Sequence, residues 1–544
     1  MVSRLSQFVC CLTVDGLRYG SGDHCLINLS NLVLDSGGFT LSAIFYFSGI
    51  ILALDNQNFS DTLMPMQDQA VVKEIPSKKD NFSEWYTSVI LKGELADYAP
   101  VRGCMVIRPY GYGLWENMQA GLDRRFKETG HRNAYFPLFI PESFLKKEAE
   151  HVKGFAPQVA WVTRGGEEDL NERLAVRPTS EAIICNMYSK WVKSYRDLPV
   201  LINQWCNIVR WEKSTRLFLR TTEFLWQEGH TVHRTEQEAQ EEALKILKLY
   251  IDFIENDLAI PVLSGSKPES EKFAGALRTY TMEALMPDGQ VLQAGTSHNL
   301  GQHFSKAFDI KYLDADNTEK FAWGTSWGVS TRLIGALIMT HGDDSGLAIP
   351  PKVAPIQVVI VPILYGKDDE RVLNKAKAIR QILSADYRVQ LDDRLEYTPG
   401  WKFNEWELRG VPLRLEIGPK DIDKGQVVLV PRDRTGKPAV KESEINRIVG
   451  TMLNDVQKNL FEKAKKFLEE NISSASTIEE FNKHLAEKPG FIKVFWCGKQ
   501  KCENDLIDKT KTTPRCIPLD KTEKGNCIVC GEKTDTVIYY ARAY

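Results

Sequence analysis

The spacing of apolar positions predicts helices and strands along most of the chain. Apolar residues recur at three- and four-residue steps from about Tyr112 to Glu128 and again over Glu236–Asn256, which predicts amphipathic helices. A further helix, rich in lysine and glutamate, is expected over Asn446–Glu470. Residues 356–364 (IQVVIVPIL) are almost continuously apolar, which is typical of a buried strand in a parallel sheet. Strands and helices alternate from there to about residue 444, which predicts a small α/β domain.

Two strands joined by a polar loop are expected over residues 204–226. Gln204–Trp211 and Leu217–Trp226 are rich in aromatic and β-favouring residues, whereas the loop between them is hydrophilic. Guanidinium groups suit phosphate oxygens, and aromatic rings give a base a surface to stack on. The hairpin is therefore a candidate nucleotide site; the alternative is a solvated hairpin whose charges pair across strands. The charged and aromatic residues that alternate here are Arg210, Glu212, Arg220, Glu223 and Glu228 with Trp211, Phe218, Phe224 and Trp226.

The segment LAVRPTSEAI, residues 174–183, allows two interpretations. A strand is expected to end at Pro178, and Thr179–Glu181 could cap the helix that follows, with an acidic residue in its first turn. In the functional interpretation, Thr179 and Glu181 bind a substrate that carries an ammonium group, because a buried carboxylate complements a cationic nitrogen.

Length and charge limit the class of protein that this chain can be. A chain of 544 residues is long enough for three or four domains, and its apolar and charged fractions are those of a globular protein. The formal net charge of −3 gives no general basic field for nucleic acid, so any RNA contact must use local patches.

The cysteines point to a metal site. The chain has eleven, without the regular spacing of a disulfide scaffold over most of its length. Cys497 and Cys502, followed by Cys527 and Cys530, form two close pairs, which predicts a closed tetrahedral site for structural zinc in a reducing compartment. Cys516 between the pairs is expected in the core.

Residues 1–80 carry no motif. Residues 36–54 have no charge and include LSAIFYFSGIILAL, which is near the lower limit for spanning a bilayer. A poorly structured extension, a targeting segment and a membrane anchor all stay open for this region, although its acidic residues are unusual in a transit peptide.

Several motifs together resemble the class II aminoacyl-tRNA synthetases, and in particular prolyl-tRNA synthetases of the eukaryotic/archaeal type. Arg210-x-Glu212, a variable loop and Arg220-x-x-x-Phe224 resemble motif 2, within RTTEFLWQEGH. The Tyr112–Glu128 helix followed by HRNAYFPLFIP, read as a strand broken at Pro137, resembles motif 1, which forms a homodimer interface in the family. TSWGVSTRLIGALIMTHGDD resembles motif 3. RPTSE, KFAG and QAGTSH also match.

The resemblance implies an ATP site. Arg210 would contact the α-phosphate, Glu212 the adenine amino group, Arg220 the β- and γ-phosphates, and Phe224 would stack on the base. Arg332 would contact the γ-phosphate and cover the other face of the adenine. Arg210 and Arg332 are the expected catalytic residues, and no general base is needed, because positioning, arginines and Mg²⁺ carry the reaction. The remaining expected ATP contacts are Thr221, Gln293 (also to Mg²⁺), Thr296 and Ser330.

The same resemblance implies a proline site, an anticodon site and a C-terminal tyrosine. The residues expected around proline are Thr179, Glu181, Arg210, Trp226, Glu228, His230, Phe273 and His298. GWKFNEWELRG mixes aromatic and basic residues suited to unstacked RNA bases, with Trp401, Lys402 and Arg409 as candidates; the alternative is an ordinary amphipathic helix. Tyr544 matches a family tyrosine that folds back toward the active site.

The expected architecture is an α/β multidomain protein. It comprises an unassigned extension (1–80), a class II antiparallel-sheet catalytic domain (81–351), an α/β anticodon-binding domain (352–445) and an α+β C-terminal zinc-binding domain (446–544). The span of about sixty residues between motif 2 and Gln293 is too short for an editing domain. The expected partners are L-proline, ATP, tRNA(Pro) and a second copy of the chain, with no membrane unless residues 36–54 are an anchor.

The expected activity is formation of prolyl-adenylate and transfer of proline to the 3′ end of tRNA(Pro). The expected location is the cytoplasm, or an organelle if residues 1–80 target it. Within the class, a threonyl or glycyl synthetase is the nearest alternative, and RPTSE, KFAG and the cysteine pairs argue against it. Outside this class of enzymes, the alternative is a catalytically inactive paralogue that binds RNA. The presence of Arg210, Glu212, Phe224 and Arg332 argues against it. Whether alanine or cysteine is rejected cannot be read, because a proline-sized pocket discriminates poorly against small side chains.

Overall fold

The computed structural model describes residues 44–47, 50–53, 75–151, 158–364, 366, 368–520 and 523–544. Internal contacts divide the chain into two units, Met1–Val72 and Lys73–Tyr544. In the first unit, β1 (Ile44–Phe47) pairs antiparallel with β2 (Ile50–Ala53), inside the apolar run considered as an anchor. The rest of that run, and the targeting alternative, lie outside the described residues. Among the helices that the structure describes, none has the length and apolarity needed to cross a bilayer.

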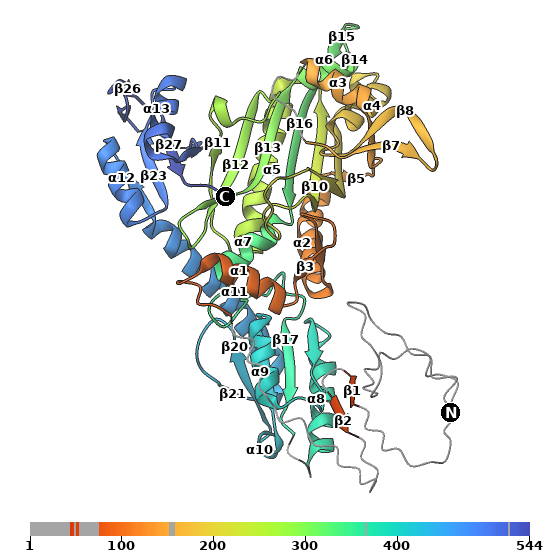
Figure 1. Ribbon diagram of the computed structural model, residues 1–544, viewed down its shortest axis with the longest axis vertical. Coiled ribbons are helices and arrows are strands. Elements are labelled where there is room, and N and C mark those ends of the chain that lie inside the picture. Colours follow the sequence, from red (N-terminus) through yellow and green to blue (C-terminus); the bar gives the residue numbers. More distant parts are fainter. Residues whose placement is uncertain are drawn as a thin grey trace, which may run out of the picture. The chain divides into compact units, whose positions relative to one another are not determined.

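The second unit begins with a helix, a hairpin and a longer helix (Figure 1). Asn81 caps the first helix, because its side chain accepts a hydrogen bond from the Glu84 N–H at 3.1 Å. The predicted helix at Tyr112 begins three residues earlier, with proline at its first position, where no N–H partner is lost. These elements are α1 (Phe82–Lys92), β3 (Ala96–Tyr98), β4 (Met105–Ile107) and α2 (Pro109–Glu128).

A seven-stranded sheet forms the centre of this unit, in the order β11-β12-β13-β16-β10-β9-β5. All neighbouring strands are antiparallel except β5 and β9, which confirms the predicted antiparallel core. The strands are β5 (Arg132–Asn133), β9 (Val200–Val209), β10 (Glu223–His233), β11 (Leu263–Ser266), β12 (Arg278–Leu285), β13 (Val291–Gly301) and β16 (Trp323–Ser330).

Two strand predictions need correction. The second strand of the hairpin begins at Glu223 instead of Leu217, because Leu217, Phe218 and Leu219 turn inward and are buried in the main hydrophobic cluster. Phe218 has a φ of 61°, which a strand does not allow. Residues 131–141 do not form one interrupted strand: β5 joins the large sheet, whereas β6 (Phe139–Pro141) belongs to another.

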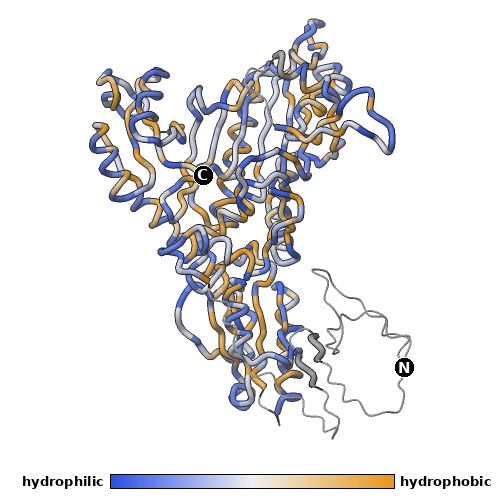
Figure 2. The backbone as a smooth tube through the Cα atoms, in the orientation of Figure 1, coloured by the Kyte–Doolittle hydropathy of each residue, from blue (hydrophilic) through white to orange (hydrophobic). Residues whose placement is uncertain are grey.

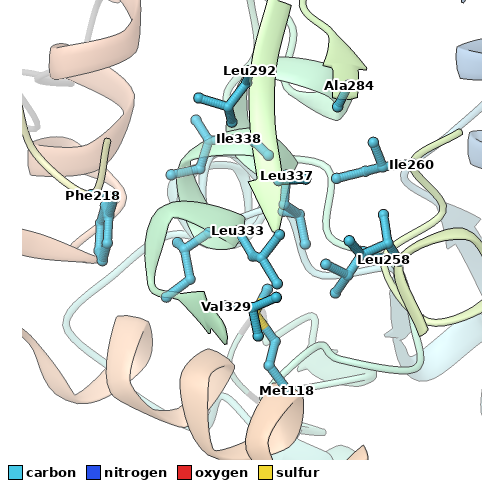
Figure 3. Packing of buried hydrophobic residues seen from close by; sticks show 14 of the residues in the cluster. Met118, Phe218, Leu258, Ile260, Ala284, Leu292, Val329, Leu333, Leu337 and Ile338 are labelled. Carbon is cyan, nitrogen blue, oxygen red and sulfur yellow. The ribbon is translucent and has the colours of Figure 1, made fainter. Parts of the chain in front are cut away.

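Two helices cover the apolar side of the large sheet. The predicted helix at 236–256 is confirmed as α5 (Glu236–Asn256). The other, α7 (Arg332–His341), is buried along nearly its whole length. Figure 3 shows Leu333 of α7 beside Val329 of β16 and Met118 of α2, and Ile338 of α7 near Leu292 of β13. These contacts fix the start of α7, and therefore Arg332, against the end of β16.

Smaller elements flank this core. A three-stranded sheet in the order β6-β8-β7 stands beside two helices, and a second pair of strands follows a short helix. These elements are β7 (Trp161–Gly165), β8 (Glu168–Val176), α3 (Glu142–His151), α4 (Glu181–Trp191), η2 (Tyr195–Asp197), η3 (Glu269–Glu271), α6 (His303–Phe308), β14 (Lys311–Leu313) and β15 (Glu319–Phe321).

Residues 358–441 form the predicted α/β domain, with a five-stranded sheet in the order β18-β17-β19-β20-β21. The first three strands are parallel and the last two pairs antiparallel. Its interior strand β17 is hydrophobic along almost its whole length in Figure 2. The elements are β17 (Val358–Pro362), α8 (Asp369–Leu383), β18 (Val389–Leu391), α9 (Pro399–Leu408), β19 (Leu413–Ile417), α10 (Pro419–Asp423), β20 (Gln426–Pro431), β21 (Ala439–Lys441) and η4 (Glu442–Glu444).

The C-terminal part is α+β, as predicted. The helix α11 (Ile445–Glu470) leads into a four-stranded sheet in the order β22-β23-β27-β24. The chain then returns to the catalytic sheet, where Ala543 forms a parallel bridge with Val291 (Figure 1). The elements are β22 (Ile472–Ser474), α12 (Ile478–Glu487), β23 (Phe491–Phe495), α13 (Gln500–Thr510), β24 (Thr513–Cys516), β25 (Gly525–Asn526), β26 (Lys533–Thr534) and β27 (Val537–Ala541).

Candidate active site

A cavity of about 330 Å³ opens on the polar face of the seven-stranded sheet. Most residues expected to bind ATP or proline line it. They come from β10, β13 and β16, from the segment that leads into α4 and its first residue, from the start of α7, and from the loops after β9 and before β12. The expected residues found here are Thr179, Glu181, Arg210, Phe224, Trp226, Glu228, His230, Phe273, Gln293, Thr296, His298, Ser330 and Arg332.

Strand alternation explains how β10 supplies its side chains. Phe224, Trp226, Glu228 and His230 are spaced by two residues and therefore share one face. Gly229 faces the other way, and a Cβ there would come within 2.1 Å of the Trp327 ring on the neighbouring strand. Glycine is required at that position because the indole lies against the backbone.

A β-bulge explains the contribution of β13. Gln293 has the opposite parity to Thr296 and His298, so an ideal strand would point it to the other face. The pairing with β12 shifts between Met282 and Glu283, where Ala294 is the additional residue on β13. The shift lets all three side chains line the same cavity.

At one end of the cavity, Glu228 is held by several donors. One carboxylate oxygen accepts from the Ser180 hydroxyl at 2.5 Å and from the Gln204 amide at 2.9 Å. The other accepts from the Ser180 backbone N–H at 3.0 Å and lies 3.1 Å from His230 Nε2. Ser180 stands at the N-cap position of α4, but its side chain does not cap the helix. The carboxylate is therefore fixed before any ligand arrives.

Burial and hydrogen bonding set the charges at this end. Burial raises the pKa of Glu181, whose Oε2 accepts from the Thr179 hydroxyl. Burial also acts to raise the pKa of Glu228, but the hydrogen bonds from His230 and Ser180 outweigh it and lower that pKa to about 2. For His230, burial is outweighed by Glu228 and Glu181, so its pKa is raised. Ligand atoms of Glu181, Glu228 and His230 lie within 4.8 Å of one another, which suits a cationic nitrogen.

An aromatic and neutral wall completes this end. The ring of Phe273 lies 4.6 Å from that of His298, and burial lowers the pKa of His298 to about 3. His298 Nδ1 lies 3.0 Å from the Thr279 hydroxyl oxygen. The imidazole is therefore neutral at pH 7 and offers a hydrogen-bonding group beside an apolar surface.

The other end of the cavity carries arginines. Arg210 donates through Nε to the Pro178 carbonyl at 3.0 Å, and its guanidinium carbon lies 5.7 Å from the centre of the Phe224 ring. Burial, and then repulsion from Arg220 and Arg210, lowers the pKa of Arg332 to about 10. Like charges held this close create a site for an anion.

Three expected ATP residues lie outside this cavity. Glu212 and Arg220 line a second hollow that also reaches Arg210, and they face each other at 3.9 Å. The Arg220 side chain is 54% exposed. Thr221 is buried, and its hydroxyl donates to the Glu223 carbonyl at 2.7 Å. The structure therefore brings together the residues around Glu181 and Glu228 but leaves the motif 2 loop apart from the cavity.

Several residues of the site escaped prediction. Glu271, Thr279 and Ser326 line the cavity, and Gln204 and Ser180 hold Glu228 from behind. Gln204 is paired directly with Glu228 across the two strands. The correct pairing of the two hairpin strands would have identified Gln204 as the partner of Glu228. The second strand was predicted to start at the wrong residue, so this pairing was not available.

The candidate anticodon residues differ in availability. Lys402 is 2% exposed; its ammonium donates to the Asp392 carbonyl at 3.1 Å and lies 3.7 Å from the Asp392 carboxylate. Arg409 is paired with Glu94 at 2.5 Å and with Glu405 at 2.9 Å. Trp401 is partly exposed and stacks on Tyr397 at 3.9 Å. Trp401 is thus the candidate with an accessible surface.

The four cysteines predicted as zinc ligands come together. Their sulfur atoms all lie within 4.8 Å of one another, and those of Cys530 and Cys497 are 3.7 Å apart. Sulfurs at ~2.3 Å from a tetrahedral zinc are ~3.8 Å apart, so the spacing fits the ion. Cys516 is fully buried away from the group, as predicted. A four-thiolate set is consistent with a structural zinc site.

The C-terminal tyrosine returns to the catalytic sheet. The Tyr544 backbone N–H donates to the Val291 carbonyl at 3.2 Å, and its hydroxyl donates to Asp288 at 2.6 Å. The guanidinium of Arg216, in the motif 2 loop, lies 5.7 Å from the centre of its ring. The last residues therefore contact both the sheet and that loop.

Comparison with protein families gives three matches in chain order. Residues 161–341 match the tRNA synthetase class II core domain (G, H, P, S and T). Residues 357–451 match the anticodon binding domain, and residues 478–544 match the C-terminal domain of prolyl-tRNA synthetase.

Curated relatives agree over most of the chain. It is 61% identical over 483 residues to a proline–tRNA ligase of Natranaerobius thermophilus, a match that covers 88% of this chain and all of that protein. It is 57% identical to a proline–tRNA ligase of Alkaliphilus oremlandii and 55% identical to proline–tRNA ligase 2 of Clostridioides difficile, with the same coverage. The chain therefore belongs to the prolyl-tRNA synthetase family of class II aminoacyl-tRNA synthetases.

Proposed function

We propose that this chain activates L-proline with ATP and transfers it to the 3′ end of tRNA(Pro). The observation that carries the proposal is one cavity that holds a buried acidic group, Glu181 with Glu228, at one end and the guanidiniums of Arg210 and Arg332 at the other. Proline has a cationic nitrogen and ATP an anionic triphosphate, so the two ends match the two substrates.

The acidic end is the proposed proline site. Glu181, Thr179 and Glu228 would hold the secondary ammonium, while Trp226, Phe273, His230 and His298 would surround the pyrrolidine ring and carboxylate. A buried carboxylate favours a cation strongly because few waters compete with it. From the arginine end, Arg210 would bind the proline carboxylate as it approaches the α-phosphate.

Activation needs no protein nucleophile. A proline carboxylate oxygen forms a bond to the α-phosphorus of ATP, the bond to the β,γ-diphosphate breaks, and diphosphate leaves with its electron pair. Negative charge builds on the α-phosphate oxygens, where Arg210 is already fixed and stabilises it without reorganisation. Arg332 would hold the γ-phosphate and cover the adenine opposite Phe224.

The outer part of the ATP site requires movement of the motif 2 loop. Glu212, Arg220 and Thr221 are proposed to meet the adenine and the β- and γ-phosphates once ATP draws the loop over the cavity. Gln293, Thr296 and Ser330 are neutral donors and acceptors that suit the nucleotide. Gln293 also suits a Mg²⁺ ion bound chiefly by phosphate oxygens and water. Such an ion would neutralise phosphate charge.

Transfer follows activation. The terminal ribose hydroxyl of tRNA(Pro) attacks the prolyl carbonyl, an ester forms, and AMP leaves. Trp401 is proposed to stack on an anticodon base. Residues 234–290, all of them described, form α5, β11, η3 and β12 within the core, so this stretch holds no inserted editing domain.

The remaining assignments complete the proposal. Domain divisions at residues 80, 351 and 445 follow the change from one sheet to the next. Zinc bound by Cys497, Cys502, Cys527 and Cys530 would be structural, because four thiolates leave no open position. Reduced thiolates favour a reducing compartment, and we propose the cytoplasm. A homodimer formed through the motif 1 region and the eukaryotic/archaeal subtype stay predictions.

The test is ATP–pyrophosphate exchange by the full chain with each of the twenty amino acids in turn. Exchange with proline, with at most weak exchange for alanine or cysteine, supports the proposal. Exchange with threonine or glycine instead would assign another class II specificity. Folded protein that exchanges with no amino acid would favour an inactive RNA-binding paralogue.

A further inference from the structure

The loop between β11 and β12 supplies part of the proposed proline pocket. It carries Glu271 and Phe273 to the cavity. On the inner side, the Phe273 N–H donates to the Thr279 hydroxyl at 3.0 Å, which in turn lies 3.0 Å from His298. This side of the loop is therefore tied to the cavity floor.

The outer side of the same loop contacts the C-terminal part of the chain. The hydroxyl of Ser270, next to Glu271, donates to a carboxylate oxygen of Glu503 in the first turn of α13. Glu503 is 1% exposed, and the Gln500 amide donates to the same oxygen at 3.3 Å. Its second oxygen is buried without a hydrogen-bond partner among the described residues. A buried carboxylate with so few donors makes the contact with Ser270 costly to lose.

The approach of the two parts is close and well defined. Ser266 and Ile517 exchange two backbone hydrogen bonds, at 2.9 and 2.8 Å, at the edge of β11. A Cβ on Gly265 would lie 2.2 Å from the Ile517 carbonyl oxygen, so only glycine permits this contact. The C-terminal part is thus fixed at the edge of the catalytic sheet where the loop begins.

A buried ionic group adds to this interface. The Glu283 carboxylate of β12 forms ion pairs with Lys267 at 2.8 Å and with Arg515 of β24 at 2.6 Å. All three side chains are buried. Lys267 is the first residue of the loop, and Arg515 belongs to the C-terminal sheet. The beginning of the loop is therefore positioned by the C-terminal part as well as by the catalytic sheet.

We propose that Glu503 is a positioning residue for proline binding, acting through Ser270 on Glu271 and Phe273. This inference rests on the proposed function, since it needs proline to occupy the acidic end of the cavity. Without the Ser270–Glu503 contact, the loop becomes more mobile in the free protein. Proline binding must then overcome the entropy lost when the loop becomes ordered. ATP would bind at the other end of the cavity, away from the loop.

The first test is ligand binding by the full chain, followed through tryptophan fluorescence, with proline and ATP titrated separately. Ser270→Ala removes one hydroxyl from an exposed loop position and should leave the fold intact. We expect the Kd for proline to rise about fivefold, the factor for one hydrogen bond of about 1 kcal/mol, and the Kd for ATP to stay unchanged. Ser474→Ala, at an exposed position on β22, is the matched control and should change neither.

The second test is a double-mutant cycle between Ser270→Ala and Glu503→Ala. The double variant should bind proline no more weakly than Glu503→Ala alone, because both changes remove one contact. Glu503→Gln should restore most of the affinity, since its amide oxygen can still accept from Ser270. Glu487→Ala, on the exposed side of α12, is the control for loss of a carboxylate.

Additive effects in the cycle, or an equal loss of proline and ATP affinity, would overturn the inference. An unchanged proline Kd in Ser270→Ala would do the same while leaving the proposed function standing. Wild-type protein that does not bind proline at all would overturn the proposed function, and this inference with it.

Discussion

The two ends of the active-site cavity differ in how far they are organised before a ligand binds. At the proline end, Glu228 has its donors in place, and Thr179 already donates to Glu181. At the nucleotide end, Arg210 and Arg332 are partly buried, whereas Arg220 is exposed and faces Glu212 across another hollow. Under the proposed function, the smaller substrate would meet a fixed site, and the larger one a site that is only partly assembled.

Chemistry explains this difference. A single small cation gains most from carboxylates that need no rearrangement, because the cost of desolvating and orienting them is met during folding. A triphosphate with a base spans a longer distance, and arginines held together without an anion repel one another. Burial first, and then repulsion from Arg220 and Arg210, lowers the pKa of Arg332. Because Arg220 lies on an outer loop, its repulsion of the other arginines is limited until ATP binds.

The largest expected effect is at the fixed part of the nucleotide end. Arg332→Ala should lower proline-dependent pyrophosphate exchange by about 10³-fold, because a partly buried, preorganised cation proposed to meet transition-state charge is lost. Affinity for tRNA should be nearly unchanged in a filter-binding assay. An equal loss of tRNA binding would mean that Arg332 supports the fold instead.

The second-largest effect is expected at the proline end. Glu228→Gln replaces an acceptor with an amide whose NH₂ group opposes the donors from Ser180 and Gln204. We expect the KM for proline to rise about 10²-fold, since breaking a buried charged network costs about 3 kcal/mol. The KM for ATP should change little, and a parallel rise in both would erase the distinction between the two ends.

Arg220→Ala tests the mobile part of the nucleotide end. If the loop closes only when ATP is bound, removing its arginine should lower kcat about tenfold without affecting the stability of the free protein. Thermal unfolding without ligand checks stability, and the stabilisation produced by ATP should shrink. A marked loss of stability without ATP would contradict an open loop.

The smallest expected effect concerns pH. The pKa of His298 is lowered to about 3 from its usual 6.5, so between these values the unfolded chain binds the proton and the folded chain does not. Stability should therefore fall as the pH falls from 6.5 toward 3. His298→Asn removes this contribution, so its unfolding temperature should depend less steeply on pH between 6.5 and 4. Identical slopes would mean that His298 is protonated in the folded protein.

The sequence predicted the fold well where local pattern and burial agree. The helix at 236–256 was predicted to the residue because its apolar spacing is regular and Thr235 caps it. The same approach failed at Leu217–Leu219, which look like strand but are drawn into the core by Tyr86 and α7. The local sequence pattern does not show that residues distant in the chain will bury this segment.

The candidate site divides in the same way. Motif residues on strands, such as Glu228 and His298, were expected at one site from the family resemblance, and in the structure both line one cavity. Glu212 and Arg220 lie on a loop, and no periodicity fixes their direction. Lys402 looked available for RNA, but its nearest counter-charge, Asp392, is ten residues away and could not be anticipated from spacing.

The bulge at Ala294 makes the cavity depend on the number of residues in β13 as well as on their identity. Substituting Ala294 by serine would keep the count and thus the facing of Gln293. Deleting it would remove the bulge and leave Gln293 two residues from Thr296, so ideal alternation alone would then point both side chains to the cavity. The bulge thus lets two residues separated by three positions in β13 share one face, which an unbroken strand allows only for separations of two or four.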